Sequence, residues 1–369
     1  MFSKIRKYFV LDISVIFLFL SVNAFAYDIS EKFTVEGTLT GVYQYGDLDI
    51  DNVDEADRGA VVFDLGTNFH PTEKDEFQIT LSFAAGNGLN YMELFSLAPY
   101  ADDLEDDLKD INGRNRDYLL EAWYKHTFKF SENMSLGLTG GIIDATAYID
   151  DNNFANDEVA QFMNDSFVNN PLANLPSYDI GGVADLNISN LSLKALFMSS
   201  KNEENSEYNY YSLQLAYKLN TGIGEGNYRI YGFITNDKFT AWNGADEENL
   251  TGVGISIDQQ LSKIIGIFAR LGWQDDSAII GHDQIYSGGV NLNGDLWGRK
   301  DDVFGAGYSY LNGADDGEID NTDAFEAYAK FKISDFSDVT VDFQYISDNM
   351  KQGRDQDGLI YGMRVNAYF

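Results

Sequence analysis

Hydrophobic and polar residues alternate with a period of two in the segment 359–369, which reads LIYGMRVNAYF. Gly362, Arg364 and Asn366 fall on one face of the strand that this pattern predicts. A strand that crosses a bilayer at a tilt needs about 9–11 residues, and apolar-out, polar-in alternation is typical of a transmembrane β-barrel. The pattern therefore predicts a membrane-spanning strand. Its other face carries Leu359, Tyr361, Met363, Val365, Ala367 and Phe369.

Comparable alternation recurs throughout the chain and predicts sixteen strands, an even number that suits a closed bacterial barrel rather than fourteen or eighteen strands. Three of the segments, 134–145, 282–296 and 301–313, are less regular than the others. The fold class is therefore predicted to be all-β, a transmembrane antiparallel β-barrel. The segments are 33–44, 58–70, 77–86, 117–130, 134–145, 178–189, 191–200, 208–220, 226–237, 248–262, 263–276, 282–296, 301–313, 322–334, 338–349 and 359–369.

The connections between these segments alternate in length. Short ones, such as 131–133 and 335–337, follow the even-numbered segments, and the longest, 45–57, 87–116 and 146–177, follow odd-numbered ones. Short periplasmic turns opposite long extracellular loops are characteristic of outer-membrane barrels. A soluble sandwich or propeller would have shorter strands and loops of similar length at both ends. All four prolines, which cannot donate to a strand ladder, fall in the connections: Pro71, Pro99, Pro171 and Pro176.

The first 26 residues have the pattern of a secretory signal peptide. Lys4, Arg6 and Lys7 form a basic start, residues 8–22 are mostly apolar, and Ala24-Phe25-Ala26 is a small-x-small cleavage site. We therefore predict a signal peptide over 1–26 and an outer-membrane barrel domain over 27–369. Export fits an outer membrane of a Gram-negative bacterium.

Composition excludes some sources of stability and some classes of binding partner. The chain has no cysteine, 14% aromatic residues and 34 glycines, so a barrel must be stabilised by strand closure and not by disulfides. The net charge of −34 argues against nucleic acid as a partner and against a polybasic lipid-binding patch, because both need a basic face. Outer-membrane lipid is expected as the surroundings of the barrel.

A sixteen-stranded barrel is wide enough for an aqueous channel unless a segment folds into it. The third external connection, 146–177, carries Tyr148, Phe154, Phe162 and Phe167, which need burial. We expect this loop to fold inward and narrow the pore; the alternative is an extracellular flap. The candidate constriction residues are Asp144, Asp151, Asn153, Phe154, Asn156, Asp157 and Phe162.

Alternation assigns a set of charged and aromatic residues to the lumen. Mixed acids, bases and rings can bind a sugar, because hydroxyls bond to charged groups and rings stack on the apolar face of the sugar. The alternative is that these charges only pair and keep the channel wet. The solute-contact candidates are Glu121, Trp123, Lys125, Arg270, Glu326, Tyr328 and Arg364, and the further lumen residues are Glu36, Asp64, Arg229, Lys330 and Asp342.

Catalysis finds little support. His70, His126 and His282 fall on different segments, and the sequence contains no Gly-x-Ser-x-Gly motif and no histidine pair at metal-ligand spacing. The acidic external loops do not match an EF-hand pattern. Binding of divalent cations by their carboxylates remains an open alternative. We predict no enzyme, cofactor or metal site, with a Ser/His barrel hydrolase as the remaining alternative.

Three blocks of sequence resemble the OprB-type carbohydrate-selective porins. They are GIIDATAYIDDNNFANDE (141–158) continued by QFMNDSFVNNP (161–171), RKDDVFGAGY (299–308) and DFQYI (342–346), in the same order as in that family. This chain departs from the family at Val341, where a proline is common, and at 348–350, where Asp-Asn-Met replaces Asn-Pro.

The resemblance implies a sixteen-stranded porin that admits small sugars by passive diffusion, as a monomer or a homotrimer. Two other functions remain open from the residues alone. One is a non-selective, cation-preferring porin, which the acidic composition favours. The other is a non-conducting structural or adhesive barrel.

Overall fold

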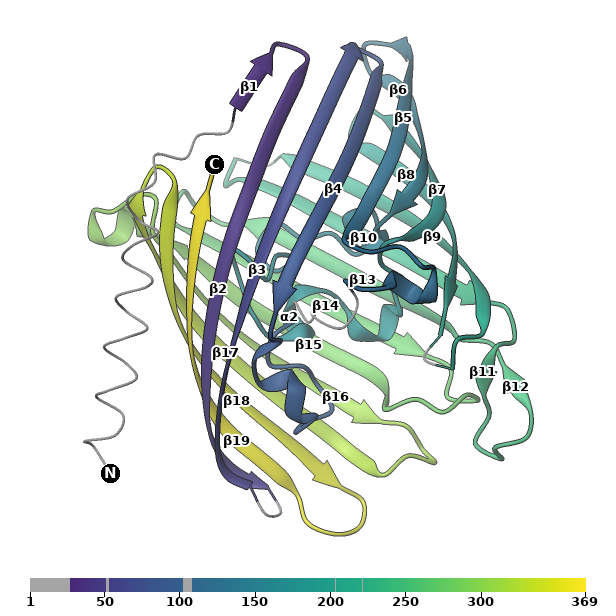
Figure 1. The fold of residues 1–369 in the computed structure, drawn as a ribbon, viewed down its shortest axis with the longest axis vertical. Helices are drawn as coiled ribbons and strands as arrows, with labels where there is room; N and C mark the ends of the chain where they lie inside the picture. The colour runs from purple at the N-terminus through teal and green to yellow at the C-terminus, as the bar shows by residue number, and fades with distance from the viewer. Residues whose placement is uncertain (1–26, 51–52, 102–107, 203, 221) are drawn as a thin grey trace.

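A closed barrel of sixteen long antiparallel strands makes up the computed structural model (Figure 1), which describes residues 27–50, 53–101, 108–202, 204–220 and 222–369. The predicted signal peptide, 1–26, lies outside the described residues. The barrel strands are β2 Phe33–Ile50, β3 Val53–Thr72, β4 Asp75–Ala85, β5 Leu119–Ser131, β6 Met134–Ile143, β7 Asp179–Ile188, β8 Leu191–Lys201, β9 Glu207–Asn220, β10 Glu225–Thr235, β13 Thr251–Gln260, β14 Ile265–Gln274, β15 His282–Asn293, β16 Val303–Gly313, β17 Ile319–Ser334, β18 Ser337–Met350 and β19 Gln356–Tyr368.

Each barrel strand pairs with its neighbours in the chain, and β19 pairs with β2 to close the ring. In that seam Val365 lies opposite Gly41, and the backbone of Phe369 exchanges two hydrogen bonds with Gly37, at 2.7 and 2.9 Å. The predicted fold is confirmed, and its first and last predicted segments, 33–44 and 359–369, pair at the closing seam. A short strand, β1 Tyr27–Ser30, pairs with the start of β2.

The alternation of the sequence is the alternation of the two barrel faces. On β19, Tyr361 is 48% exposed on the outer face, whereas Arg364 and Asn366 are fully buried on the inner one. Aromatic rings gather on the outer face at the periplasmic end, where Phe77 packs 4.7 Å from Tyr124 between ring centroids. Amphipathic rings at a membrane boundary are a regular feature of such barrels.

The prediction of a long connection over 45–57 is wrong, because β2 continues to Ile50 and β3 begins at Val53. The alternation of inward and outward residues continues through this stretch despite its many acids, and Leu48 and Ile50 point inward and are buried. Apolar residues of the next loop cover them, so the hairpin remains a strand pair beyond the predicted ends.

Other strand ends differ from the prediction by a few residues, and two of these differences have a clear local cause. The segment 282–296 ends as a strand at Asn293, whose side chain caps a one-turn helix by accepting from the Asp295 amide at 2.9 Å. The connection from β10 to β13 contains a two-residue hairpin, β11 Phe239–Thr240 with β12 Glu247–Glu248, so the strand predicted from residue 248 starts at Thr251.

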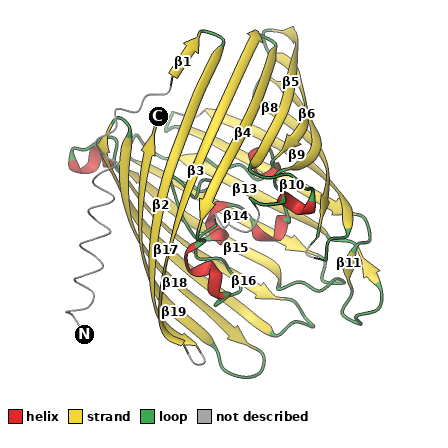
Figure 2. Ribbon diagram, in the orientation of Figure 1, coloured by secondary structure: helices red, strands yellow, loops and turns green. Residues whose placement is uncertain are grey.

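The helices are short, and most of them lie inside the ring of strands (Figure 2). They are η1 Gly88–Met92, η2 Ile111–Gly113, η3 Ala145–Ala147, α2 Asp165–Val168, η4 Pro171–Ala173 and η5 Gly294–Trp297. None of the helices in the described ranges combines the length and the apolar character needed to cross a membrane.

Candidate functional site

Loop three, which we define as residues 144–178 between β6 and β7, is folded by its own polar side chains. Asp144, Asn164 and Asn170 precede η3, α2 and η4, and each accepts a hydrogen bond from the amide two residues ahead, at 3.0 Å. Pro171 starts η4, where its missing amide hydrogen costs nothing. Many of the Asp and Asn residues of this loop therefore shape its backbone.

Arg270, on β14, binds loop three from the barrel wall. Its guanidinium donates to the carbonyl oxygens of Phe167, at 2.7 Å, Asp150, at 3.1 Å, and Ala155, and its Nε lies 2.9 Å from Asp150 Oδ2. The side chain is fully buried. Because the planar guanidinium offers five donors, one residue can gather several parts of a folded loop.

A second group of wall residues holds the middle of loop three. Glu326, on β17, accepts hydrogen bonds from the backbone amides of Met163, at 2.6 Å, and Asn164, at 2.8 Å. Arg364, on β19, donates to two loop carbonyls, one of them that of Gln161 at 2.9 Å. The wall thus supplies an acceptor where the loop presents amides and a donor where it presents carbonyls.

The start of loop three is held by strands on the other side of the lumen. Lys194, on β8, and Gln214, on β9, donate to the Tyr148 carbonyl at 3.0 and 3.2 Å. Arg229, on β10, pairs with the Asp151 carboxylate at 2.9 Å. Loop three therefore crosses the barrel interior, as predicted, and is not an extracellular flap.

Apolar packing adds to these polar contacts. The ring of Phe162 lies 5.0 Å from that of Phe167 and meets that of Tyr328, on β17, edge to face at 5.0 Å. All three side chains are almost fully buried. Buried aromatic side chains contribute large apolar areas and pair contacts, so this cluster is a hydrophobic core inside the barrel.

Two wall glycines provide space for the loop. A Cβ atom on Gly266 would lie 2.3 Å from the ring of Phe154, and one on Gly307 would lie 2.8 Å from the ring of Phe167. Glycine in a strand interior often marks a close approach of another segment. Here the approaching segment is loop three.

Loop two, which we define as residues 86–101 and 108–118 between β4 and β5, also enters the barrel. The Pro99 carbonyl accepts from the side-chain amides of Gln44, on β2, at 2.8 Å and Gln344, on β18, at 2.9 Å. The Ser96 amide donates to Asp348, also on β18, at 2.7 Å. Wall residues on either side of the closing seam therefore bind the same loop.

Loops two and three are joined to each other. The Ala101 amide donates to the Met163 carbonyl at 2.7 Å, and the Asp165 amide donates to the Ala98 carbonyl at 3.0 Å. The inward course of loop two was not predicted. Its signal was a set of apolar residues too numerous for a solvated loop, which are Leu89, Leu94, Leu97 and Tyr100, all buried.

The periplasmic half of β2–β5 remains uncovered, and we call its inward side chains the open wall: Glu36, Thr38, Asp64, Asn68, Glu76, Gln78, Thr80, Glu121, Trp123 and Lys125. Hydrogen bonds connect neighbouring members. The Thr80 hydroxyl donates to Glu121 at 3.1 Å, Gln78 donates to Thr80 at 3.2 Å, and Asn68 donates to Gln78 at 3.0 Å. The wall thus presents a continuous row of polar groups.

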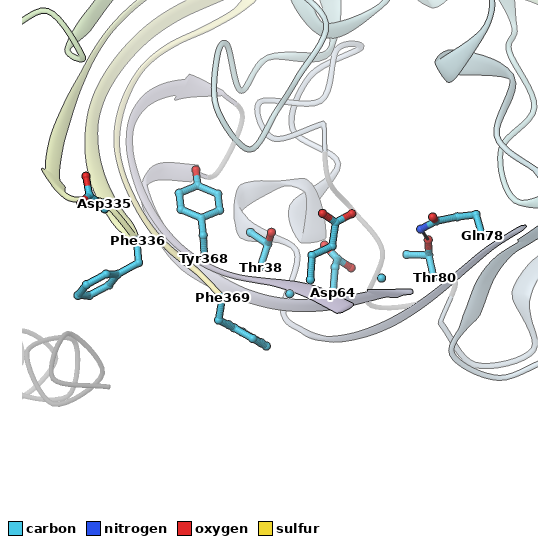
Figure 3. A pocket seen from close by; sticks show the side chains of 11 residues that line it. Thr38, Asp64, Gln78, Thr80, Asp335, Phe336, Tyr368 and Phe369 are labelled. Carbon is cyan, nitrogen blue, oxygen red and sulfur yellow. Dashed lines mark hydrogen bonds between the residues drawn. The ribbon is translucent and has the colours of Figure 1, made fainter. Parts of the chain in front are cut away.

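The open wall is accessible where the rest of the inner wall is covered. Lys125 lies 4.0 Å from Glu76, and their side chains are 35% and 27% exposed. A cavity of about 380 Å³ lies along its periplasmic part (Figure 3), and another, of about 450 Å³, lies on the external side between loops two and three. We call the first of these the inner cavity and the second the outer cavity. The lining of the outer cavity includes Asp144, Thr146 and Glu158.

The predicted solute-contact residues divide between the two parts of the wall. Glu121, Trp123 and Lys125 belong to the open wall, and solute contact by them stays a prediction. The other four are at most 1% exposed beneath loop three, where they act as anchors and packing partners: Arg270, Glu326, Tyr328 and Arg364.

The predicted constriction residues differ in burial and in hydrogen bonding within loop three. Asn153 is exposed, whereas Phe162 is fully buried and Phe154 is half-buried against β14. The Asp157 carboxylate caps its own turn by accepting from the amides two and three residues ahead, at 2.8 and 2.9 Å. The Asn156 side chain accepts from Asn169 at 3.1 Å. Constriction by these residues stays a prediction.

Loop three places acidic and phenolic groups opposite the open wall. Burial raises the pKa of the Asp144 carboxyl above its ordinary value. The hydrogen bonds from Thr146 lower this pKa, but by less than burial raises it. Burial, together with the nearby carboxylates of Glu121, Glu76 and Asp144, raises the pKa of Tyr148 to about 12. Tyr148 therefore stays a neutral hydrogen-bonding phenol at physiological pH.

Metal and catalytic sites are not assembled by the described residues. No group of three or more His, Asp or Glu side chains among them could hold a metal ion. His126 bonds to Asp75, at 2.7 Å, and His282 to Thr322, at 2.8 Å, on well-separated strands.

Comparison with known proteins identifies the family. The model of the carbohydrate-selective porins of the OprB family matches residues 59–369. This chain belongs to the OprB family. It is an outer-membrane porin of a Gram-negative bacterium, and its relatives are channels and not enzymes. The resemblance inferred from the three sequence blocks is therefore confirmed.

Solved structures support the fold of this OprB-family porin. The high-pH structure of Pseudomonas putida OprB superposes with a TM-score of 0.74 at 14% identity, covering 92% of this chain and 94% of that one. OmpT of Vibrio cholerae reaches a TM-score of 0.55 at 10% identity, covering 94% and 100%. An uncharacterized protein of Aquifex aeolicus is 34% identical over 279 residues, which are 74% of this chain and 79% of that one.

Proposed function

We propose that this porin is selective for carbohydrates and lets small sugars diffuse passively between the outer cavity and the periplasm. The observation that carries the proposal is the open wall, a hydrogen-bonded row of hydroxyl, amide and carboxylate groups left accessible by two inward loops. A sugar that leaves bulk water needs its hydroxyls paired throughout its passage, and such a row provides partners along the way.

The open wall is matched by groups of loop three. Trp123, on β5, and Tyr148, on loop three, are both half-buried and pack against the same apolar cluster. Rings of this kind stack on the apolar face of a pyranose, while Glu121 and Thr80 accept and donate hydrogen bonds beside them. In this proposal Glu121 acts as acceptor, Lys125 as donor and Trp123 as stacking surface.

Liposome swelling tests the proposal. In vesicles containing the purified protein, hexoses should enter faster than neutral amino acids of equal size. The Trp123→Ala variant should reduce hexose entry more than amino acid entry, because the stacking surface is specific for rings. Equal entry of both solute classes in the parent protein would contradict carbohydrate selectivity.

A non-selective, cation-preferring porin is the second candidate. It is favoured by the carboxylates of the open wall and of the outer cavity, since rings of acidic side chains enrich cations in a pore. A reversal potential measured in a KCl gradient reports this preference. Strong K⁺ preference combined with equal entry of sugars and amino acids would support this second function.

A further inference from the structure

The cavity at the periplasmic end of the open wall has an unusual chemical composition. It occupies about 380 Å³ between β2, β3, β4 and the end of β19. This volume falls within the range of small-molecule pockets. Of the described residues that line it, none is a lysine, arginine or histidine; the lining consists of Glu36, Gly37, Thr38, Asp64, Gly66, Gln78, Thr80, Asp335, Phe336, Tyr368 and Phe369.

The polar members of this lining point to one side of the strands. Figure 3 shows Thr38, Asp64, Gln78, Thr80 and Tyr368 projecting to the same side, whereas Phe336 and Phe369 project to the other. The ring of Phe369 stacks on Phe63, which belongs to the outer face of the barrel, at 5.6 Å. The polar side is therefore the lumen, and a solute in the cavity meets hydroxyl, amide, phenol and carboxylate groups.

The carboxylates of the cavity lack cationic partners. Within the part of the chain that the structure describes, no lysine, arginine or histidine nitrogen lies within 4.0 Å of Glu36 or Asp64, and Glu36 is exposed. The third carboxylate, Asp335 at the rim, lies 3.8 Å from Lys332. Two unneutralised negative charges thus face the same small volume of water.

The three buried arginines of the lumen do not compensate for these charges, because loop three or other carboxylates engage them. Arg270 and Arg364 are fully buried and bonded to loop carbonyls, and Arg229 is held between Asp151 and Asp258 at 2.9 and 2.7 Å. A solute that reaches the inner cavity therefore meets a negative electrostatic potential.

We infer that the inner cavity is a subsite that favours amino sugars over neutral sugars and disfavours acidic sugars. The ammonium group of an amino sugar can approach Glu36 and Asp64, while its hydroxyls bond to Thr38, Gln78 and Thr80. The carboxylate of an acidic sugar would face two like charges without a basic partner. This inference rests on the proposed function, since it assumes that sugars use this passage.

Uptake of labelled sugars into proteoliposomes tests the inference. Glucosamine, glucose and glucuronate share one ring and differ in charge, and pH 6 keeps the amine protonated. At an ionic strength of about 0.01 M, where screening is weak, glucosamine should enter roughly threefold faster than glucose and glucuronate more slowly still. At about 1 M salt the differences should largely vanish, because the Debye length shrinks to about 3 Å.

The matched variants are two double substitutions with the same change in charge. Glu36→Gln with Asp64→Asn should remove the preference for glucosamine. Glu73→Gln with Glu132→Gln changes two exposed residues of periplasmic turns, neither of which lines the cavity. This control pair should leave the preference intact.

The outcomes separate this inference from the proposed function. Equal entry of the three sugars at low salt would overturn the inference, even if hexoses still outpace amino acids and the proposed function stands. A glucosamine preference that survives Glu36→Gln with Asp64→Asn would also overturn it. A preference that is lost in that variant and kept in the control supports the subsite, with glucose uptake showing that both variants fold.

Discussion

The two sides of the lumen wall differ in how their polar residues are used. The covered side includes β9, β10, β14 and β17–β19. There, side chains such as Arg270 and Glu326 bond to backbone groups of loop three and are inaccessible to solvent. On the open wall, residues such as Lys125 and Glu76 stay partly exposed and bond mainly to each other. An inward-facing charge is therefore a pore residue only where no loop satisfies it.

The contrast also concerns the basic side chains. Arg229, Arg270 and Arg364 are all buried in the covered wall, together with acids such as Glu326, while carboxylates predominate in the open wall. A folded loop presents many carbonyl oxygens that bind arginine, so the side chains left accessible on the open wall are mostly acidic. The pore thus acquires its electrostatic character partly from which residues the loops cover.

Removing an anchor should have the largest effect on this contrast. In Arg270→Met the Asp150 carboxylate and several loop carbonyls lose their partner, which should cost about 3–5 kcal/mol, as for a broken buried ion pair. Loop three should then leave the covered wall, and single-channel conductance should rise severalfold. The matched variant Arg354→Met alters an exposed arginine between β18 and β19, which pairs with the exposed Asp49, and should leave conductance unchanged.

A conductance for Arg270→Met equal to that of the parent protein would contradict the anchoring role. Protease digestion of membranes carrying each variant gives a second measurement. Cleavage within loop three should accelerate in Arg270→Met and not in Arg354→Met, because only the first frees the loop.

A smaller effect is expected from filling the space under the loop. In Gly266→Ala the new Cβ would lie 2.3 Å from the ring of Phe154, so the ring must move, at a cost of about 1–3 kcal/mol. Gly41→Ala is the control, since no atom lies within 4 Å of its Cβ position. Conductance should change only in the first variant.

A double-mutant cycle sharpens this prediction. Phe154→Ala removes the ring that Gly266→Ala displaces, so the two changes should not be additive in conductance or in thermal stability. Strict additivity would show that Phe154 and β14 do not constrain each other.

The smallest effect on the fold should come from the open wall. Glu121→Gln keeps a side chain that can bond to Thr80, so barrel stability should change by less than about 0.5 kcal/mol. Sugar uptake should still fall, by roughly two- to threefold, because a bond to a charged acceptor is replaced by a weaker neutral one. Glu132→Gln, in an exposed periplasmic turn, should have no effect on uptake, and a fall equal to that of Glu121→Gln would remove the open wall from the passage.

The strands and the inward course of loop three were predictable because both follow from local pattern. Period-two alternation set the positions of all sixteen strands, and Phe162 and Phe167 marked a loop with side chains to bury. Arg364 was likewise placed on the inner face from alternation alone. Such patterns report direction, which the backbone determines residue by residue.

What could not be predicted depends on contacts between distant segments. Whether Arg364 faces water or a loop carbonyl depends on residues some 200 positions earlier in the chain. The same holds for Leu48 and Ile50, which remain in a strand because loop two covers them. Burial of an inward residue is a tertiary property, so alternation identified the lumen face without separating its covered and open parts.

The two backbone hydrogen bonds between loops two and three have a consequence for electrical recordings. Since the Ala101–Met163 and Asp165–Ala98 contacts join the loops, neither can swing away without the other. Thermal opening of the pore should then be a rare, cooperative event, and current traces should show a steady level interrupted by discrete steps. Shortening loop two would uncouple the pair and replace those steps with rapid, graded flicker.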